Sequence, residues 1–111
     1  MTDPIDRAFL TLQLEYLASM PARVEELRTD IGGFRAGHPD AADSLKVRLH
    51  RLAGSGGSYG FLDISSMARE AQRWLTRFPA PGEADQLEAI VDRIAKAVGE
   101  AEGELKKRVS G

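Results

Sequence analysis

Apolar residues recur at spacings of three and four along most of the chain, which is the pattern of amphipathic helices. The first such segment is "TDPIDRAFLTLQLEYLAS", with Pro4 at a favourable first helical position. Ser19 and Pro21 predict a break after it, followed by a second helix. The expected core face of that second helix consists of Met20, Val24, Leu27, Ile31 and Phe34.

Three more helices follow in the pattern. Pro39 and Asp40 are start signals for a helix over about residues 40–58, another helix starts at Asp63, and "PAPGEAD" ends it before a long last helix. The expected core faces are Ala42, Leu45, Leu49, Leu52 and Gly56; then Ile64, Met67, Ala68, Ala71, Leu75 and Phe78; then Leu87, Ile90, Val91, Ile94, Val98, Ala101 and Leu105.

No segment alternates with period two over a useful length, and the connections between helices are short. The pattern therefore predicts an all-α fold, an up-and-down antiparallel four-helix bundle with an additional N-terminal helix. At 111 residues the chain suits one domain over residues 1–111. Its size and ends lead us to expect a stand-alone module.

Composition removes several classes of function. Charged residues make up 29% and apolar ones 42%, as in soluble domains, and no apolar run reaches the ~20 residues of a membrane span. The start "MTDPIDRAFL" does not resemble a secretion signal and there is no cysteine, so we expect a cytoplasmic protein. A net charge of −2 without an evident basic stripe argues against nucleic-acid binding. We expect a monomer.

The segment "HRLAGSGGSYGF" places glycines and serines after good helix formers. At about 100° per residue, His50 lies on the flank of the core stripe, and Lys46, Gly54 and Gly57 share that flank. If the helix continues, each of its glycines costs about 1 kcal/mol relative to alanine, which favours the close approach of something bulky to the histidine. Gly56, on the core side, favours a tight helix contact. The alternative is a surface histidine followed by a glycine–serine turn.

Other chemistry finds little support. A phosphate-binding loop needs a lysine followed by serine or threonine, and Tyr59 stands where a dinucleotide motif has its last glycine. His38 precedes a proline and belongs to a turn between helices, so two separated histidines and no cysteine predict no metal site. Trp74 and Tyr59 are interpreted as packing at the edges of the core.

The order of residues from His50 to Gly60 resembles the active helix of the histidine-containing phosphotransfer (HPt) domain family, roughly His-x-Leu-Lys-Gly-Ser-small-small-x-apolar-Gly. Here it reads His-Arg-Leu-Ala-Gly-Ser-Gly-Gly-Ser-Tyr-Gly. The resemblance implies that His50 accepts a phosphoryl group from the aspartate of a response-regulator receiver domain and passes it to another receiver. It also implies a hybrid histidine kinase as partner, magnesium in the receiver, and no cofactor of the chain's own.

The resemblance assigns further roles within the motif and around it. Leu52 and Gly60 are structural positions, and Arg51, Gly54, Gly57 and Ser58 form a surface on which the receiver docks. Ala53 departs from the family, which usually has a lysine there.

We expect Lys46 to supply positive charge in place of that lysine, although an ordinary solvated lysine fits as well. Gln72 on the following helix is expected to hydrogen-bond the imidazole, and Arg69 to help neutralise the phosphate. The competing hypothesis is a helical adaptor that binds a receiver or kinase without being phosphorylated. An autonomous enzyme is not expected, because no general base, metal set or nucleotide cradle accompanies the histidine.

Overall fold

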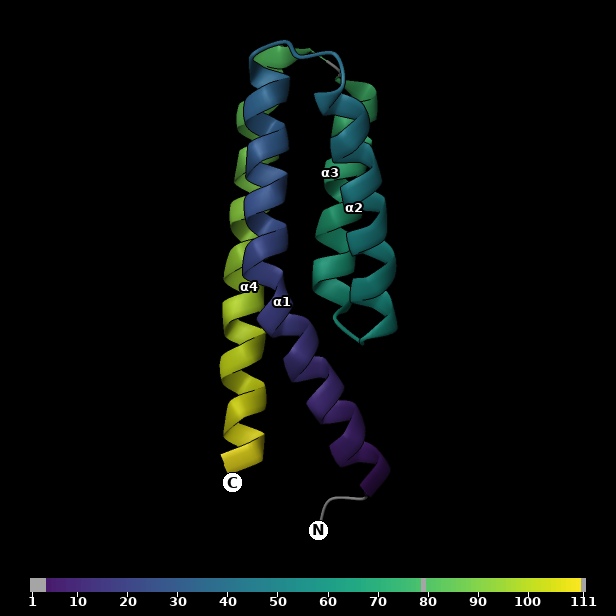
Figure 1. Ribbon diagram of the computed structural model, residues 1–111, viewed down its shortest axis with the longest axis vertical. Coiled ribbons are helices and arrows are strands. Elements are labelled where there is room, and N and C mark those ends of the chain that lie inside the picture. The colour runs from purple at the N-terminus through teal and green to yellow at the C-terminus, as the bar shows by residue number, and fades with distance from the viewer. Residues whose placement is uncertain (1–3, 79, 111) are drawn as a thin grey trace.

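The computed structural model describes residues 4–78 and 80–110, and these residues form helices joined by short turns, with no strand among them. The elements are α1 (Pro4–Arg35), α2 (Ala41–Ser58), α3 (Leu62–Arg77), the 3₁₀ helix η1 (Pro81–Glu83) and α4 (Ala84–Ser110). The helices run alternately up and down along one long axis (Figure 1). The all-α bundle predicted from the sequence is confirmed, and η1 occupies the expected break at "PAPGEAD".

The additional N-terminal helix is wrong as a separate element, because the chain does not break at Ser19 and Pro21. α1 is one helix of 32 residues with Pro21 inside it. Proline removes a backbone hydrogen bond and its ring crowds the carbonyl four residues earlier, which bends a helix. Figure 1 shows such a bend about midway along α1. Leu17 and Met20 are fully buried just before the proline, so core packing holds the helix together across it.

The four long helices enclose a single core, each packing on two neighbours: α1 on α2 and α4, and α3 on α2 and α4. α2 and α3 form a shorter hairpin, and both α1 and α4 continue beyond its turn (Figure 1). The predicted core faces are largely buried, with Ala42, Met67, Phe78 and Ala101 only half-buried at their margins. Within the described residues no helix combines the length and apolarity needed to cross a membrane.

The turn between α2 and α3 depends on Gly60. The Phe61 N–H donates to the Gly56 carbonyl and the Gly60 N–H donates to the Gly57 carbonyl, so the last carbonyls of α2 are satisfied as in a Schellman motif. Gly60 adopts φ +84°, a left-handed conformation that favours glycine. This turn reverses the chain at once and lays α3 against α2.

Candidate functional site

His50 lies near the middle of α2, and its side chain is exposed. The preceding residue, Leu49, is fully buried in the core. α2 continues through the glycines to Ser58, so the alternative of a glycine–serine turn is wrong. The turn begins only after Ser58. A rigid helix therefore presents the imidazole to solvent.

The three glycines after His50 differ in what surrounds them. A Cβ built on Gly54 meets nothing within 4 Å, so the space around this position, one turn beyond the histidine, is unoccupied by other parts of the protein. A Cβ on Gly56 lies 3.2 Å from the Ser65 backbone nitrogen, so this glycine allows the close α2–α3 contact that was predicted. Gly57 is half-buried and turned towards α3, where a Cβ lies 3.6 Å from Ser65 Oγ. Gly54 alone of the three leaves fully open space.

The pairing of α2 with α3 sets which side chains approach His50. The Ser65 hydroxyl donates to the Ala53 carbonyl across the interface at 2.6 Å. Because the two helices are antiparallel, moving back along α2 corresponds to moving on along α3, so these contacts place His50 opposite the turn of α3 that carries Arg69 and Gln72. Lys46 and Arg69 are exposed, and Gln72 is half-buried in the crease between the helices.

None of these polar side chains is engaged elsewhere. Across residues 4–78 and 80–110, no ion pair involves Lys46 or Arg69, and no hydrogen bond joins Gln72 to the imidazole of His50. Two cationic groups thus stand beside the histidine without a carboxylate to neutralise them. Such an arrangement attracts an anion to the imidazole.

Arg51 and Ser58 occupy other parts of the α2 surface. Arg51 is exposed on the side of α2 that faces α1, where it lines a hollow with Arg23, Glu26 and Arg48. Ser58 is exposed at the last position of α2. Arg51 is therefore turned towards α1 and Lys46, Arg69 and Gln72 lie towards α3, on either side of the exposed face of α2 that carries Val47 and Gly54.

The motif positions Leu52 and Ala53 face inwards. Leu52 is 3% exposed and Ala53 is 4% exposed. A side chain at position 53 starts inside the α2–α3 contact, so a lysine there would have to extend between the helices to reach solvent. The residue that replaces the family's lysine is a small core residue.

Two nearby side chains were missed by the sequence analysis. Val47 is an aliphatic residue on the polar side of α2, 48% exposed and one turn before His50. Arg73 follows Arg69 on the exposed face of α3. The sequence could have identified Val47 as an exposed aliphatic residue, because it lies off the Leu45–Leu49–Leu52 stripe.

The other singled-out residues lie away from this group. His38 is in the turn between α1 and α2, as predicted, and Tyr59 and Trp74 pack at the edge of the core. Tyr59 stacks on Tyr16 with ring centroids 4.4 Å apart. No three histidine, aspartate or glutamate side chains of the described residues come together as metal ligands would.

Comparison with known proteins agrees with this arrangement. The family model of the Hpt domain matches residues 12–104, which is most of the chain and includes all of α2 and α3. No curated protein and no solved structure matches the chain significantly. Hpt domains carry out histidine phosphotransfer in two-component signalling and interact with receiver domains and kinases. With the helical bundle and the motif of α2, the match establishes that this chain belongs to the Hpt domain family.

Proposed function

We propose that His50 is the phosphoacceptor of a multistep phosphorelay. A receiver domain brings its phospho-aspartate to the imidazole, a P–N bond forms as the acyl-phosphate P–O bond breaks, and the aspartate carboxylate leaves. A second receiver accepts the group by the reverse exchange. The protein is thus a phosphotransfer intermediate between a hybrid kinase and a response regulator, acting as a monomer in the cytoplasm.

The observation that carries the proposal is an exposed imidazole in the middle of a rigid helix with open space at Gly54. In-line phosphoryl transfer needs positioning and charge neutralisation more than covalent assistance. A helix fixed by the buried Leu49 and Leu52 holds the nucleophile in one place. The vacant position lets the surface of a receiver come close.

The side chains around His50 suit the charge of the transferred group. Lys46 lies one turn before it on α2, and Arg69 lies level with it on α3. Each adds positive charge where the phosphoryl oxygens develop negative charge. In this proposal these two residues take over the part of the lysine that Ala53 replaces. Gln72 is half-buried in the same crease, where its amide is available to orient the imidazole.

Most of the catalytic machinery belongs to the partner in this mechanism. The receiver supplies the magnesium ion and the lysine that neutralise its own phospho-aspartate. The chain supplies the nucleophile and a surface on which to dock, made of Arg51, Gly54, Gly57 and Ser58 with Val47 beside them. The exposed aliphatic Val47 adds an apolar contact to an otherwise polar surface.

The test is phosphoryl transfer from a panel of purified receiver domains that are phosphorylated with radiolabelled acetyl phosphate. We expect acid-labile, alkali-stable label on the wild-type chain and none on His50→Gln. His38→Gln is the matched control, because it removes the other histidine, which is also exposed. Equal labelling of wild type and His50→Gln would overturn the assignment. Receiver binding without labelling would identify an adaptor instead.

A further inference from the structure

We propose that three arginines on the exposed side of α3, Arg69, Arg73 and Arg77, form an electrostatic docking surface for a receiver domain with carboxylates along its rim. This arginine row steers the association and shifts the footprint of the partner from α2 towards α3. The inference rests on the proposed function, since it concerns the partner of the same histidine. It adds the outer arginines of α3 and an acidic rim on the receiver, neither of which phosphoryl transfer at His50 requires.

The row is defined by its spacing along α3. The three arginines are four residues apart, so they follow one side of the helix and all three are exposed. With Gln72 and Thr76 they line one shallow hollow on the surface of α3. Arg69, the first of the row, is level with His50. The row therefore starts at the candidate phosphoacceptor and leads away from it.

No carboxylate of the described residues neutralises this row, whereas other arginines of the bundle are paired. Arg28 bonds Asp92 at 2.7 Å, Arg35 bonds Asp85 at 2.7 Å, and Arg93 bonds Glu70 at 2.6 Å. Glu70 is the acid nearest in sequence to the row, and it pairs with Arg93 of α4 instead. The Arg77 guanidinium carbon lies 5.6 Å from the centre of the Phe78 ring, and this contact does not neutralise its positive charge.

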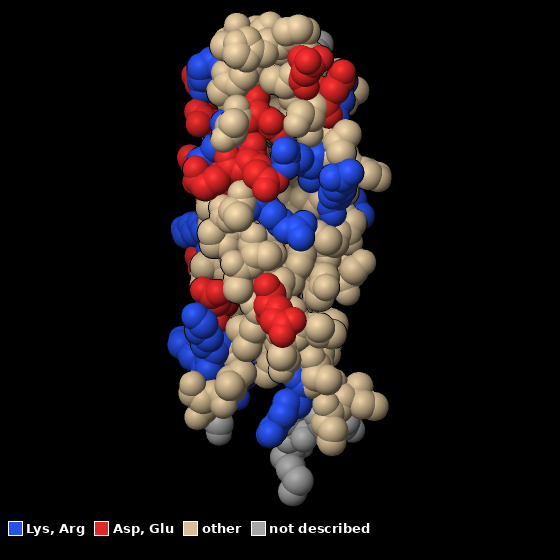
Figure 2. Space-filling model, viewed as in Figure 1, with Lys and Arg blue, Asp and Glu red and all other residues tan. Residues whose placement is uncertain are grey.

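The opposite side of His50 has a different charge balance. Towards α1, Arg48 pairs with both Glu26 and Asp30, so its charge is compensated within the molecule. Figure 2 shows acidic side chains gathered over the upper part of α1 and basic ones beside them over α2. Arg23 and Arg51 on that side have no ion pair among the described residues, but Glu26 lines the same hollow, whereas no carboxylate lines the hollow of the arginine row. An anionic partner that approaches the histidine therefore meets a carboxylate towards α1 and only cationic and neutral side chains towards α3.

The length of the row points to a protein partner and not to the phosphoryl group. Arg69 to Arg77 spans eight residues, which is about 12 Å along a helix. A single phosphoryl group on His50 is much shorter than this span. The row therefore extends beyond it, and its far end at Arg77 meets the surface of whatever carries the phosphate. Arginine side chains bind carboxylates in a forked, two-bond geometry, so acidic residues around the receiver's active site are the matching chemistry.

The experiment compares association rates of a receiver domain with the wild type and with Arg69→Gln/Arg73→Gln/Arg77→Gln. The receiver domain for this experiment is one from the same panel that binds the wild-type chain, whether or not it transfers a phosphoryl group to it. Steering of this kind changes association rates by about 10-fold to 10³-fold and weakens with salt. We expect the triple variant to associate at least about tenfold more slowly at low salt, with a flatter salt dependence and a similar dissociation rate.

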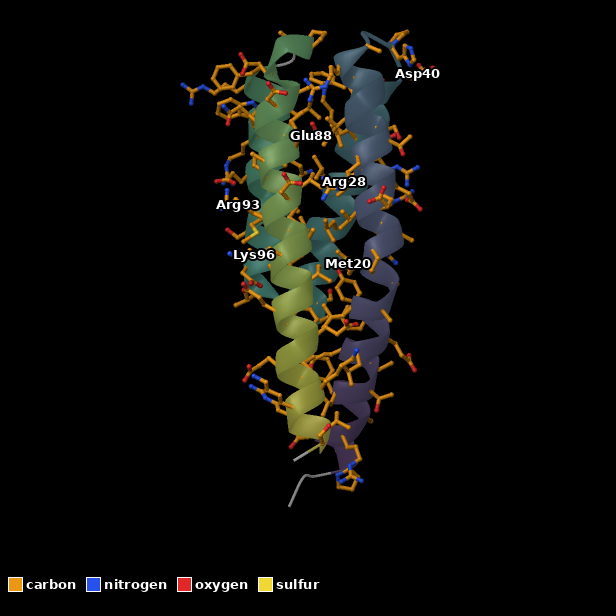
Figure 3. The ribbon with its side chains drawn as sticks, turned by 90° about the vertical axis from the view of Figure 1, so that its left-hand side faces the viewer. Met20, Arg28, Asp40, Glu88, Arg93 and Lys96 are labelled. Carbon is orange, nitrogen blue, oxygen red and sulfur yellow. The ribbon has the colours of Figure 1, made fainter. Side chains whose placement is uncertain are left out.

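The matched control is Lys96→Gln/Lys107→Gln/Arg108→Gln, which removes the same net charge from exposed, unpaired positions on α4. Figure 3 shows Lys96 on α4 pointing away from α1, and Lys107 and Arg108 lie in the last turn of the same helix. The control should associate like the wild type. Arg69→Lys/Arg73→Lys/Arg77→Lys should largely restore the rate because it keeps the charge. An association rate and salt slope that match the wild type in a folded glutamine variant would overturn the proposal.

The two proposals fail in different ways. Phosphoramidate, a small donor with no protein surface, labels a reactive histidine without docking. If it labels His50 equally in the wild type and in Arg73→Gln/Arg77→Gln, which keeps Arg69, while receiver association with the triple variant slows, both proposals hold. If it labels neither chain but association still slows, the arginine row stands and phosphotransfer at His50 fails. Equal association with normal labelling refutes only the row.

Discussion

Gly54 shows at the residue scale how an absent side chain contributes to the site. It is exposed in the interior of α2, and a Cβ there would meet no neighbouring atom within 4 Å. The fold does not need a glycine at this position, because neither close packing nor a positive φ requires it. Glycine in a helix interior lowers stability by about 1 kcal/mol relative to alanine. The explanation we favour is access to His50.

A leucine at position 54 separates the effect of this residue on stability from its effect on access to His50. Gly54→Leu should fold normally and gain up to about 1 kcal/mol in free energy of unfolding, because it removes a helix-interior glycine. It should slow transfer from a receiver by about tenfold or more, equivalent to ~1.4 kcal/mol of docking free energy. Urea unfolding and transfer kinetics measure the two effects. Gly54→Ala is the smaller control, and normal transfer by the leucine variant would show that the glycine has no docking role.

At the scale of elements, the α2–α3 contact determines where Arg69 and Gln72 lie. Gly56 lets the backbone of α3 approach, and the buried Ser65 fixes the register by its hydrogen bond to the Ala53 carbonyl. The turn at Gly60 closes the hairpin within three residues. The spacing of these two helices is therefore built into a few small residues that adjoin the site.

Neighbouring glycines test this contact. Gly56→Ala places a methyl group 3.2 Å from the Ser65 backbone nitrogen, so it should lower the free energy of unfolding by about 1–3 kcal/mol. Gly57→Ala makes an ordinary contact of 3.6 Å with Ser65 Oγ and should be neutral or stabilising by up to about 1 kcal/mol. Chemical denaturation of both variants measures the difference. Equal stabilities would mean that α3 can shift without loss and that the close contact does not set the spacing.

At the scale of the whole molecule, the site and the core meet along one helix. Leu49 is fully buried and His50 is exposed, although they are adjacent in the chain. Salt bridges between α1 and α4, such as Arg28–Asp92, lie on the side away from the α2–α3 hairpin, and Figure 3 shows Arg28 and Glu88 between these two helices. Function and stability can therefore be changed separately.

Two substitutions at adjacent positions measure that separation. Leu49→Ala should reduce the free energy of unfolding by about 2–5 kcal/mol, because it leaves a cavity in the core. His50→Ala should change it by no more than about 0.5 kcal/mol while abolishing phosphorylation. Thermal and urea unfolding, followed by circular dichroism, provide the comparison. A large loss of stability in His50→Ala would mean that the imidazole supports the fold and is not held free for a partner.

The sequence by itself determined the helices, their core faces and the exposed flank of His50. Periodicity carries this information because a helix repeats every 3.6 residues, so Leu45, Leu49 and Leu52 must share a side and His50 must leave it. The special role of Gly56 and the turn near Gly60 were also readable from residue type. The break expected at Pro21 was not, because burial of Leu17 and Met20 outweighs the local preference of a proline.

Only the tertiary structure decided which side chains from different helices share the site. Nothing local to α3 says that Arg69 lies level with His50, since that follows from the register fixed by Ser65 and Gly56. Nor does composition show a basic row, because a net charge of −2 averages over arginines that are paired and arginines that are not. Pairing across helices, as in Arg48 with Asp30, neutralises some charges and leaves Arg69, Arg73 and Arg77 uncompensated. Charge and proximity between helices depend on packing, which periodicity along one chain does not encode.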